Sequence, residues 1–219
     1  MSSRILELSS KSKESILNKI KNAYSEKDFT YIPSIDPIDH INTKDDALSE
    51  LKQKMSDNKY IVEECTKDQL EEKINEIVAK YDYQKMIYGQ GLNLDLSKIK
   101  ANEKICFDKN IEELRSEVFQ SDFSVIHARA GVSSHGVALV LSSKEQPRML
   151  SLAPKLCIVL LQKENIVKSL SEALNLVKKE NKILPSNILF IAGPSRTADI
   201  ELITVFGVHG PQQAHIILY

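Results

Sequence analysis

Short apolar runs of strand length alternate with amphipathic stretches of helical period along most of this chain, from Tyr60 to Tyr219. The predicted strands cover residues 60–62, 85–88, 105–107, 123–126, 137–141, 156–161, 188–192 and 214–218. The predicted helices cover residues 44–57, 66–81, 111–118 and 166–177. Strands that alternate with helices of this length predict an α/β fold, with a mostly parallel sheet that helices cover on both faces.

Two local signals refine this pattern. Thr66 followed by Gln69 is typical of a capping box at the start of a helix. The apolar runs 123–126 and 137–141 are separated by a short segment that contains Gly131 and Gly136. This spacing predicts two adjacent strands across a loop rather than strands joined by a helical crossover.

The N-terminal residues differ in composition from the rest of the chain. They are rich in Ser and Lys, and a proline-punctuated connector follows at residues 31–40. One face of a short predicted helix carries Ile16, Leu17, Ile20, Ala23 and Tyr24. We therefore expect an N-terminal helical arm over residues 1–43, followed by an α/β domain over residues 44–219.

Charge and composition narrow the class of protein. The 219 residues carry 29 Lys and Arg against 30 Asp and Glu, without a basic block interleaved with aromatics, so nucleic acid is not an expected partner. We expect no membrane span, and we predict a cytoplasmic location because the polar start lacks the apolar region of a signal peptide. Cys65, Cys106 and Cys157 are far apart, which argues against a disulfide framework, a structural zinc site or a cluster motif.

A turn with several polar side chains follows the predicted strand at residues 188–192. Gly193 supplies permissive backbone dihedrals, and Ser195 is expected to cap a new helix. The amides of that helix start, with Arg196 beside them, predict a site for a carboxylate or phosphate. The predicted anion-binding residues are Gly193, Ser195, Arg196, Thr197, Asp199 and, from a later turn, His209. The alternative is an ion pair between Arg196 and Asp199 on the first helical turn.

His209 has two interpretations, and a second group of polar residues is expected near the same site. His209 lies between glycines, where it is suited either to proton transfer or to a hydrogen bond with the turn backbone. Residues that follow the predicted strand 123–126 are expected to line the same site, because ligands of open α/β sheets bind beyond the carboxyl ends of strands. This second group consists of His127, Arg129, Ser134 and His135. No metal site is predicted from these histidines.

Signals for a self-sufficient enzyme are weak. Gly89 and Gly91 form a lone Gly-x-Gly without the third glycine of a dinucleotide-binding loop. There is also no nucleophile elbow, no phosphate-binding loop of the Walker type and no Ser-His-Asp spacing. We accordingly predict no cofactor in this chain.

Four segments resemble a known family. They are the run from Gly193 to Ile200, the run from Gly207 to Pro211, Ala128 to Val132, and Leu150 to Pro154. Together they closely resemble the lactate utilization protein C family, which is built on the LUD domain, over roughly residues 61–219. The family usually reads Ala-Glu-Thr-Gly-Thr where this chain reads Ser133 to Val137. Ser134 therefore stands in the position of the family glutamate.

The resemblance implies a fold and a function. The fold it implies is the one shared by CoA transferases and ribose-phosphate isomerases, described as NagB/RpiA/CoA transferase-like. The function it implies is a part in converting L-lactate to pyruvate, alongside two partner proteins that carry iron–sulfur clusters.

Two functional hypotheses follow. The first is an accessory subunit of an iron–sulfur lactate-oxidising system, which binds a small carboxylate or phosphate or assists assembly and is not catalytic alone. The second is an independent transferase or isomerase that acts on a phosphorylated or thioester substrate. The second requires a carboxylate opposite the Ser195 turn, and the replacement at Ser134 weakens it.

Overall fold

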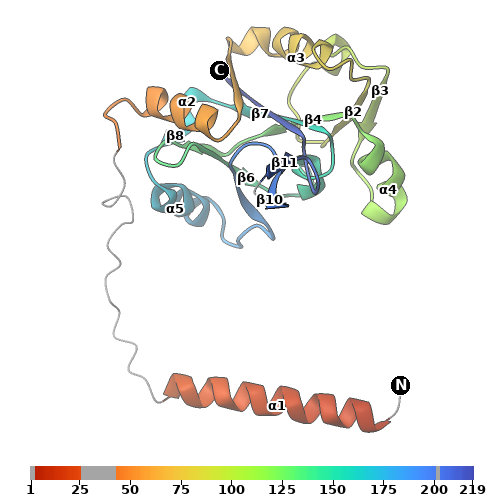
Figure 1. The fold of residues 1–219 in the computed structure, drawn as a ribbon, viewed down its shortest axis with the longest axis vertical. Coiled ribbons are helices and arrows are strands. Elements are labelled where there is room, and N and C mark those ends of the chain that lie inside the picture. The colour runs from red at the N-terminus through yellow and green to blue at the C-terminus, as the bar shows by residue number, and fades with distance from the viewer. Residues whose placement is uncertain (1–2, 26–42, 201–202) are drawn as a thin grey trace. The chain divides into compact units, whose positions relative to one another are not determined.

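The computed structural model describes residues 3–25, 43–200 and 203–219, with side chains over 11–23, 43–197 and 204–219. The chain divides into two units, Met1–Asp36 and Pro37–Tyr219. The first contains helix α1 (Ser3–Ser25), which is the predicted arm helix (Figure 1). Ile16, Leu17 and Ile20 of this helix are exposed. The predicted connector at 31–40 lies outside the described residues, so the boundary between residues 43 and 44 stays a prediction.

A parallel sheet of six strands forms the centre of the second unit. Its strands lie in the order β1-β12-β7-β4-β2-β3, and every pairing is parallel. They are β1 (Ile61–Glu64), β2 (Lys85–Tyr88), β3 (Glu103–Cys106), β4 (Phe123–His127), β7 (Leu156–Leu161) and β12 (Gln213–Leu218). The sequence prediction of an α/β fold with a mainly parallel sheet is thus confirmed, and strands β2 and β7 have the predicted bounds.

A second sheet of four strands lies against the first. Its order is β8-β5-β6-β9, with β8 parallel to β5 and the other pairs antiparallel. The strands are β5 (Ala130–Val132), β6 (Val137–Leu141), β8 (Ile166–Val167) and β9 (Ile188–Ile191). The predicted adjacency of 123–126 and 137–141 is therefore wrong. The chain leaves β4 into the other sheet, and the unpredicted strand β5 becomes the neighbour of β6.

The core is layered. Helix α3 (Leu70–Ala79) covers one face of the six-stranded sheet, and its Ile74 and Ile77 belong to the same buried cluster as strand residues Phe123 and Ile158. Helices α2 (Ala47–Asp57) and α4 (Ile111–Gln120) cover the opposite face together with the second sheet. Helix α5 (Leu170–Glu180) covers the outer face of the second sheet (Figure 1). The opposite face of the six-stranded sheet is thus covered by a sheet as well as by helices. Apolar side chains of strands β6 and β9 pack against this face.

Short 3-10 helices connect several elements. They are η2 (Lys67–Gln69), η3 (Leu96–Lys98), η4 (Arg148–Ser151) and η5 (Lys163–Asn165). The predicted capping box is present at the first of them. Gln69 Oε1 accepts hydrogen bonds from the backbone N–H of Thr66 at 3.1 Å and from its hydroxyl at 2.9 Å. This helix start follows directly from the local sequence.

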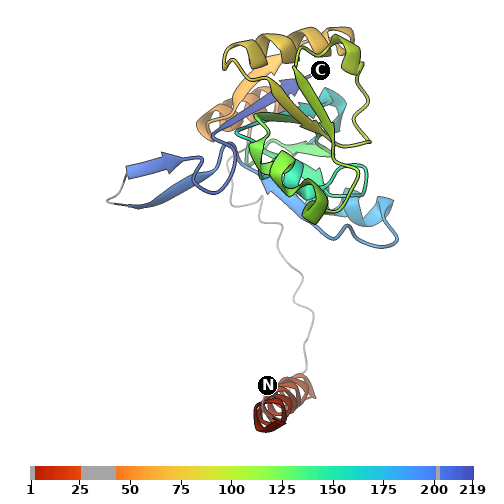
Figure 2. The ribbon, with the colours of Figure 1, turned by 90° about the vertical axis from the view of Figure 1, so that its right-hand side faces the viewer.

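An antiparallel hairpin replaces the predicted helix after Ser195. Strand β10 (Arg196–Ile200) pairs with β11 (Ile203–Phe206), with Arg196 opposite Phe206 and Thr197 opposite Val205. Figure 2 shows the hairpin extending away from the two larger sheets. The helix prediction is wrong because the β-branched and aromatic side chains of the two segments favour cross-strand pairing over a helix.

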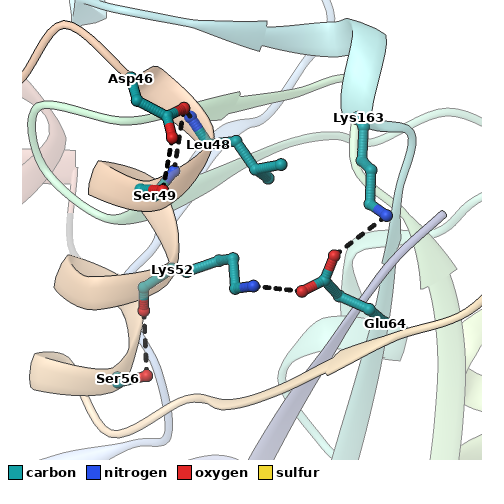
Figure 3. A network of polar contacts seen from close by, with 7 residues as sticks. All are labelled: Asp46, Leu48, Ser49, Lys52, Ser56, Glu64 and Lys163. Atoms are coloured by element: carbon teal, nitrogen blue, oxygen red, sulfur yellow. Dashed lines mark hydrogen bonds and ion pairs between the residues drawn. The ribbon is translucent and has the colours of Figure 1, made fainter.

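Helix α2 is tied to the six-stranded sheet by a polar network (Figure 3). Asp46 caps the helix by accepting hydrogen bonds from the N–H groups of Leu48 at 3.1 Å and Ser49 at 3.3 Å. Glu64, at the end of β1, pairs with Lys52 of the helix and with Lys163 of η5 at 3.0 Å. The ion pair of Lys52 with Glu64 therefore joins helix α2 to strand β1, while the Asp46 contacts are internal to the helix start.

Candidate functional site

A cavity of about 240 Å³ lies where strands β7 and β12 of the first sheet face strand β9 of the second. Its lining residues come from five stretches of the chain, which are residue 60 and segments 151–152, 157–159, 189–195 and 209–214. They are Tyr60, Ser151, Leu152, Cys157, Val159, Leu189, Ile191, Gly193, Ser195, His209, Gly210, Pro211 and Ala214. The cavity brings together three of the predicted anion-binding residues, which are Gly193, Ser195 and His209.

The lining divides by exposure. The cavity floor, defined as Tyr60, Cys157, Val159 and Ala214, is at most 3% exposed. The cavity mouth, defined as Leu152, Ser195 and His209, contains the exposed side chains of Leu152 and His209 and the half-buried Ser195. The cavity therefore has an apolar interior and a partly polar opening, which is the usual composition of a small-molecule site.

Gly193 shapes one wall of the cavity. Its φ of +82° lies in the left-handed region, as the turn prediction required. A Cβ atom at this position would lie 2.0 Å from the carbonyl oxygen of Asn58, at the end of helix α2. Gly210 differs, because its φ is not positive and a Cβ there would lie 3.1 Å from the Cβ of Ser195. Of these two cavity glycines, Gly193 therefore has both the positive φ and the closer approach to another backbone.

Backbone hydrogen bonds hold the two turns of the mouth together. The N–H of Ser195 donates to the carbonyl of Pro211 at 2.9 Å, and the N–H of Gly207 donates to the carbonyl of Ser195 at 2.9 Å. Within the described part of the chain, the hydroxyl of Ser195 and the ring of His209 have no hydrogen-bond partner. These two side chains are available to a ligand at the mouth.

The other predicted anion-binding residues lie outside the cavity. Arg196, Thr197 and Asp199 belong to strand β10, so the argument from a helix N-terminus does not apply to them. The guanidinium of Arg196 donates to the carbonyl of Ala192 at 2.9 Å and is exposed. The side chain of Asp199 lies outside the described residues. An i, i+3 helical ion pair between Arg196 and Asp199 is ruled out by the strand.

The residues that follow β4 do not reach the cavity either. The backbone N–H of His127 donates to Gln146 at 2.8 Å, and burial lowers the pKa of its ring, whose Nε2 has no partner in the described chain. Arg129 forms an ion pair with Glu180 of α5, which raises the pKa of its guanidinium further. The predicted convergence of this group with Ser195 and His209 is not seen among the lining residues.

The segment 133–136, which we call the Ser134 loop, makes hydrogen bonds within itself and to helix α2. The Ser134 hydroxyl lies 2.8 Å from His135 Nδ1, and the side-chain amide of Asn58 donates to the His135 carbonyl at 2.8 Å. The hydroxyl of Ser133 donates to Glu50 at 2.7 Å. The hydroxyls of Ser133 and Ser134 and the carbonyl of His135 therefore each have a protein partner.

Glu50 is a buried carboxylate that the sequence did not single out. Burial pushes its pKa up, but hydrogen bonds from Lys54, Ser133 and the backbone N–H of Lys44 outweigh burial and hold the pKa below its usual value. Lys54 also donates to the Ser134 carbonyl at 2.9 Å. Glu50 thus fixes the Ser134 loop on helix α2 as a charged, hydrogen-bonded anchor.

Sequence reasoning also missed Tyr60 and Cys157 of the cavity floor. Burial raises the pKa of the Tyr60 hydroxyl far above its usual range and raises the pKa of the Cys157 thiol to about 12. The Tyr60 hydroxyl donates to the carbonyl of Ile191 at 3.3 Å. Both groups are neutral at physiological pH, and their only sequence signal was membership of apolar strand segments.

Two findings concern metal and membrane. Over residues 3–25, 43–200 and 203–219, no group of three or more His, Cys, Asp or Glu side chains is placed to hold a metal ion. No helix in the same ranges has the length and apolar character needed to cross a membrane.

The fold and cavity define an α/β domain with a small, mostly apolar site, and the comparisons give its family. The LUD domain family model matches residues 48–219. The chain therefore belongs to the LUD domain family, in the group that includes proteins called lactate utilization protein C.

Curated relatives differ in how much of their length is matched. Lactate utilization protein C of Halalkalibacterium halodurans is 30% identical over 71% of this chain and 76% of its own length. The uncharacterized protein YkgG of Escherichia coli is 40% identical over 45% of this chain and 44% of its own length. The chain spans about half the length of several curated relatives that it matches.

A solved structure supports the fold. The crystal structure of a DUF162 family protein from Deinococcus radiodurans matches with a TM-score of 0.54 at 17% sequence identity, over 78% of this chain and 95% of that chain. This likeness concerns the fold alone. The kinship with CoA transferases and ribose-phosphate isomerases stays a prediction.

Proposed function

We propose that this protein is a LUD-domain subunit of a lactate-utilisation system that binds a small carboxylate at the cavity mouth. The single observation that carries the proposal is the family match over residues 48–219, together with relatives named lactate utilization protein C. The cavity supplies a place for the ligand, since Ser195 and His209 present unpaired polar groups beside an apolar interior. A cytoplasmic location belongs to the same proposal.

The proposed ligand contacts are few. The Ser195 hydroxyl and a protonated ring nitrogen of His209 are both donors suited to a carboxylate. Arg196 adds positive charge near the mouth, because its guanidinium is anchored to the carbonyl of Ala192, next to Gly193. Thr197, Asp199, His127, Arg129, Ser134 and His135 have no part in this proposal.

In this proposal, partner proteins accept the electrons that are removed from lactate. Oxidation of lactate to pyruvate removes two electrons and needs an acceptor. We propose that iron–sulfur proteins of the same system supply the acceptor, and that this chain carries no cofactor of its own. In this proposal the chain contributes ligand binding and assembly.

The transferase or isomerase alternative is not favoured by the cavity. That chemistry needs a carboxylate nucleophile or base opposite the Ser195 turn. Among the residues whose side chains the structure describes, those that line the cavity include no Asp or Glu. Glu50, the buried carboxylate of the Ser134 loop, is instead engaged by Ser133, Lys54 and the backbone of Lys44.

The decisive experiment is deletion of the gene in the source organism, followed by growth on L-lactate and complementation. The full chain is expected to restore growth, and the Ser195→Ala variant, which keeps the fold, is expected to restore it less well. Isolation of the tagged protein from lactate-grown cells is expected to recover iron–sulfur proteins. Normal lactate oxidation in the deletion strain, in the absence of a redundant dehydrogenase, would reject the proposal.

A further inference from the structure

The cavity is larger and more apolar than a three-carbon acid requires. Its volume of about 240 Å³ is far more than the roughly 10–15 Å³ of probe-occupied space that one water molecule needs. Lactate offers only a single methyl group to an apolar surface, since its other groups are a carboxylate and a hydroxyl. Much of the floor and walls is therefore left without a ligand contact when lactate alone is bound.

The apolar lining is continuous from the floor to the walls. Val159 and Ala214 are at most 3% exposed and belong to the inner face of the six-stranded sheet. Leu189 and Ile191 of strand β9 pack against the same core from the second sheet. A ligand tail placed here would be removed from water on two sides, which favours alkyl groups.

The cavity floor carries no charged side chain. The two polar groups there, the Tyr60 hydroxyl and the Cys157 thiol, stay neutral because burial raises the pKa of each. The Tyr60 hydroxyl already donates to the Ile191 carbonyl. A second carboxylate pushed against this floor would lose its hydration without gaining a charged partner, which is strongly unfavourable.

Polar groups without hydrogen-bond partners occur at the mouth of the cavity, at the opposite end from the floor. The Ser195 hydroxyl and the His209 ring, both at the cavity mouth, have no hydrogen-bond partner in the part of the chain that the structure describes. The site is therefore polarised along its depth, with hydrogen-bonding groups at the opening and alkyl side chains inside. This arrangement fits a molecule with one anionic end and one apolar end.

We propose that the cavity takes a monocarboxylic acid with a short branched or straight alkyl tail, of about five carbons in total, in preference to lactate and to dicarboxylates. The carboxylate lies at Ser195 and His209, and the tail lies against Val159, Ala214 and Cys157. The inference rests on the proposed function, in which the same mouth binds a carboxylate, and it names the class of ligand.

The test is a calorimetric titration of the full chain with a matched series of acids. The series is lactate, 2-hydroxybutanoate, 2-hydroxy-3-methylbutanoate and malate, which share the 2-hydroxy acid head. Each buried carbon is expected to tighten binding about fourfold, so the five-carbon acid is expected to bind roughly 15-fold more tightly than lactate. Malate is expected to bind no more tightly than lactate.

Floor variants locate the tail. Ala214→Val narrows the cavity and is expected to remove the preference for the five-carbon acid while lactate binding is kept. Val159→Ala widens the cavity and is expected to move the preference towards 2-hydroxy-4-methylpentanoate. Val118→Ala, a buried valine of helix α4 that does not line the cavity, is the control for a general loss of packing. The widening variant keeps the test decisive if the narrowing variant does not fold.

The outcomes separate the two proposals. Affinity that rises with tail length and responds to the floor variants supports the inference. Equal affinities along the series, or tight binding of malate, overturn the inference and leave carboxylate binding at the mouth intact. No binding of any of these acids at millimolar concentration overturns both carboxylate binding at the mouth and the inference. Tail-dependent binding that Ala214→Val leaves unchanged also overturns the inference, because the tail would then lie elsewhere.

Discussion

The Ser134 loop and the cavity mouth contain similar residue types, but their side chains differ in hydrogen bonding. Each has a serine and a histidine at a turn next to a glycine. In the Ser134 loop the hydroxyl of Ser134 meets His135, and Ser133 meets the buried Glu50. At the mouth, Ser195 and His209 have no partner within the described chain. Residue type alone therefore does not distinguish the two regions, whereas the availability of their polar groups does.

The largest expected effect is at the wall of the mouth. Gly193→Val is expected to lower the free energy of unfolding by at least about 3 kcal/mol, because it combines a positive φ with a Cβ 2.0 Å from the Asn58 carbonyl oxygen. Urea denaturation measures this loss. Gly210→Ala, with a 3.1 Å contact and an ordinary φ, is the control and is expected to cost less. A loss in Gly193→Val of less than about 1 kcal/mol would show that the mouth tolerates a side chain at Gly193.

A buried histidine extends the comparison with the exposed His209. His215 is fully buried, and burial lowers its pKa from 6.5 to about 4. The unfolded state therefore binds a proton between these values while the folded state does not. The contribution of His215 to stability is expected to fall by roughly 3 kcal/mol as the pH drops from 6.5 to 4, and this contribution is complete above pH 6.5.

This pH dependence is measured by denaturation at several pH values. His215→Gln is expected to flatten the profile between pH 4 and 6.5, although the variant also changes the contact with the Tyr81 hydroxyl at 2.8 Å. His209→Gln, at the exposed mouth, is the matched control for the replacement of a histidine by glutamine. An unchanged slope in His215→Gln would assign the acid sensitivity to other groups.

The next effect concerns the anchor of the Ser134 loop. Glu50→Gln is expected to lower the free energy of unfolding by about 2 kcal/mol, because charged hydrogen bonds from Ser133 and Lys54 are lost in a buried place. Glu64→Gln, in an exposed ion pair, is expected to cost less than about 1 kcal/mol. Carboxylate binding at the mouth is expected to be unchanged in both. A loss of binding in Glu50→Gln would contradict the separation of the two regions.

The smallest effect tests the comparison most directly. Ser195→Ala is expected to weaken carboxylate binding by about fivefold to tenfold without loss of stability, because its hydroxyl has no protein partner to lose. Ser134→Ala is expected to do the reverse, with a loss of about 1 kcal/mol in stability and unchanged binding. Calorimetric titration and denaturation of the two variants give both quantities. If the two variants behave alike, the contrast between the regions is wrong.

Local sequence patterns predicted the elements whose character depends on nearby residues. Strand β7 is apolar at all six positions because it is buried on both faces, and its predicted bounds agree with the structure. The capping box at Thr66 closes within four residues. The turn at Gly193 also follows from local backbone preference, since glycine adopts positive φ most readily.

The sequence alone thus determined an α/β domain with a parallel sheet, a turn after β9 and the polar composition of two loops. The tertiary structure decided the pairing of each segment, the hydrogen-bond partners of each polar residue and the location of the cavity. Segment 196–200 is a strand because it pairs with 203–206, and Ser133 is a structural residue because Glu50 lies 83 positions earlier in the chain. The cavity forms only when Cys157, Ile191 and Ala214 meet from three strands. The physical reason is that pairing, burial and hydrogen-bond satisfaction depend on residues far apart in sequence, which no local pattern records.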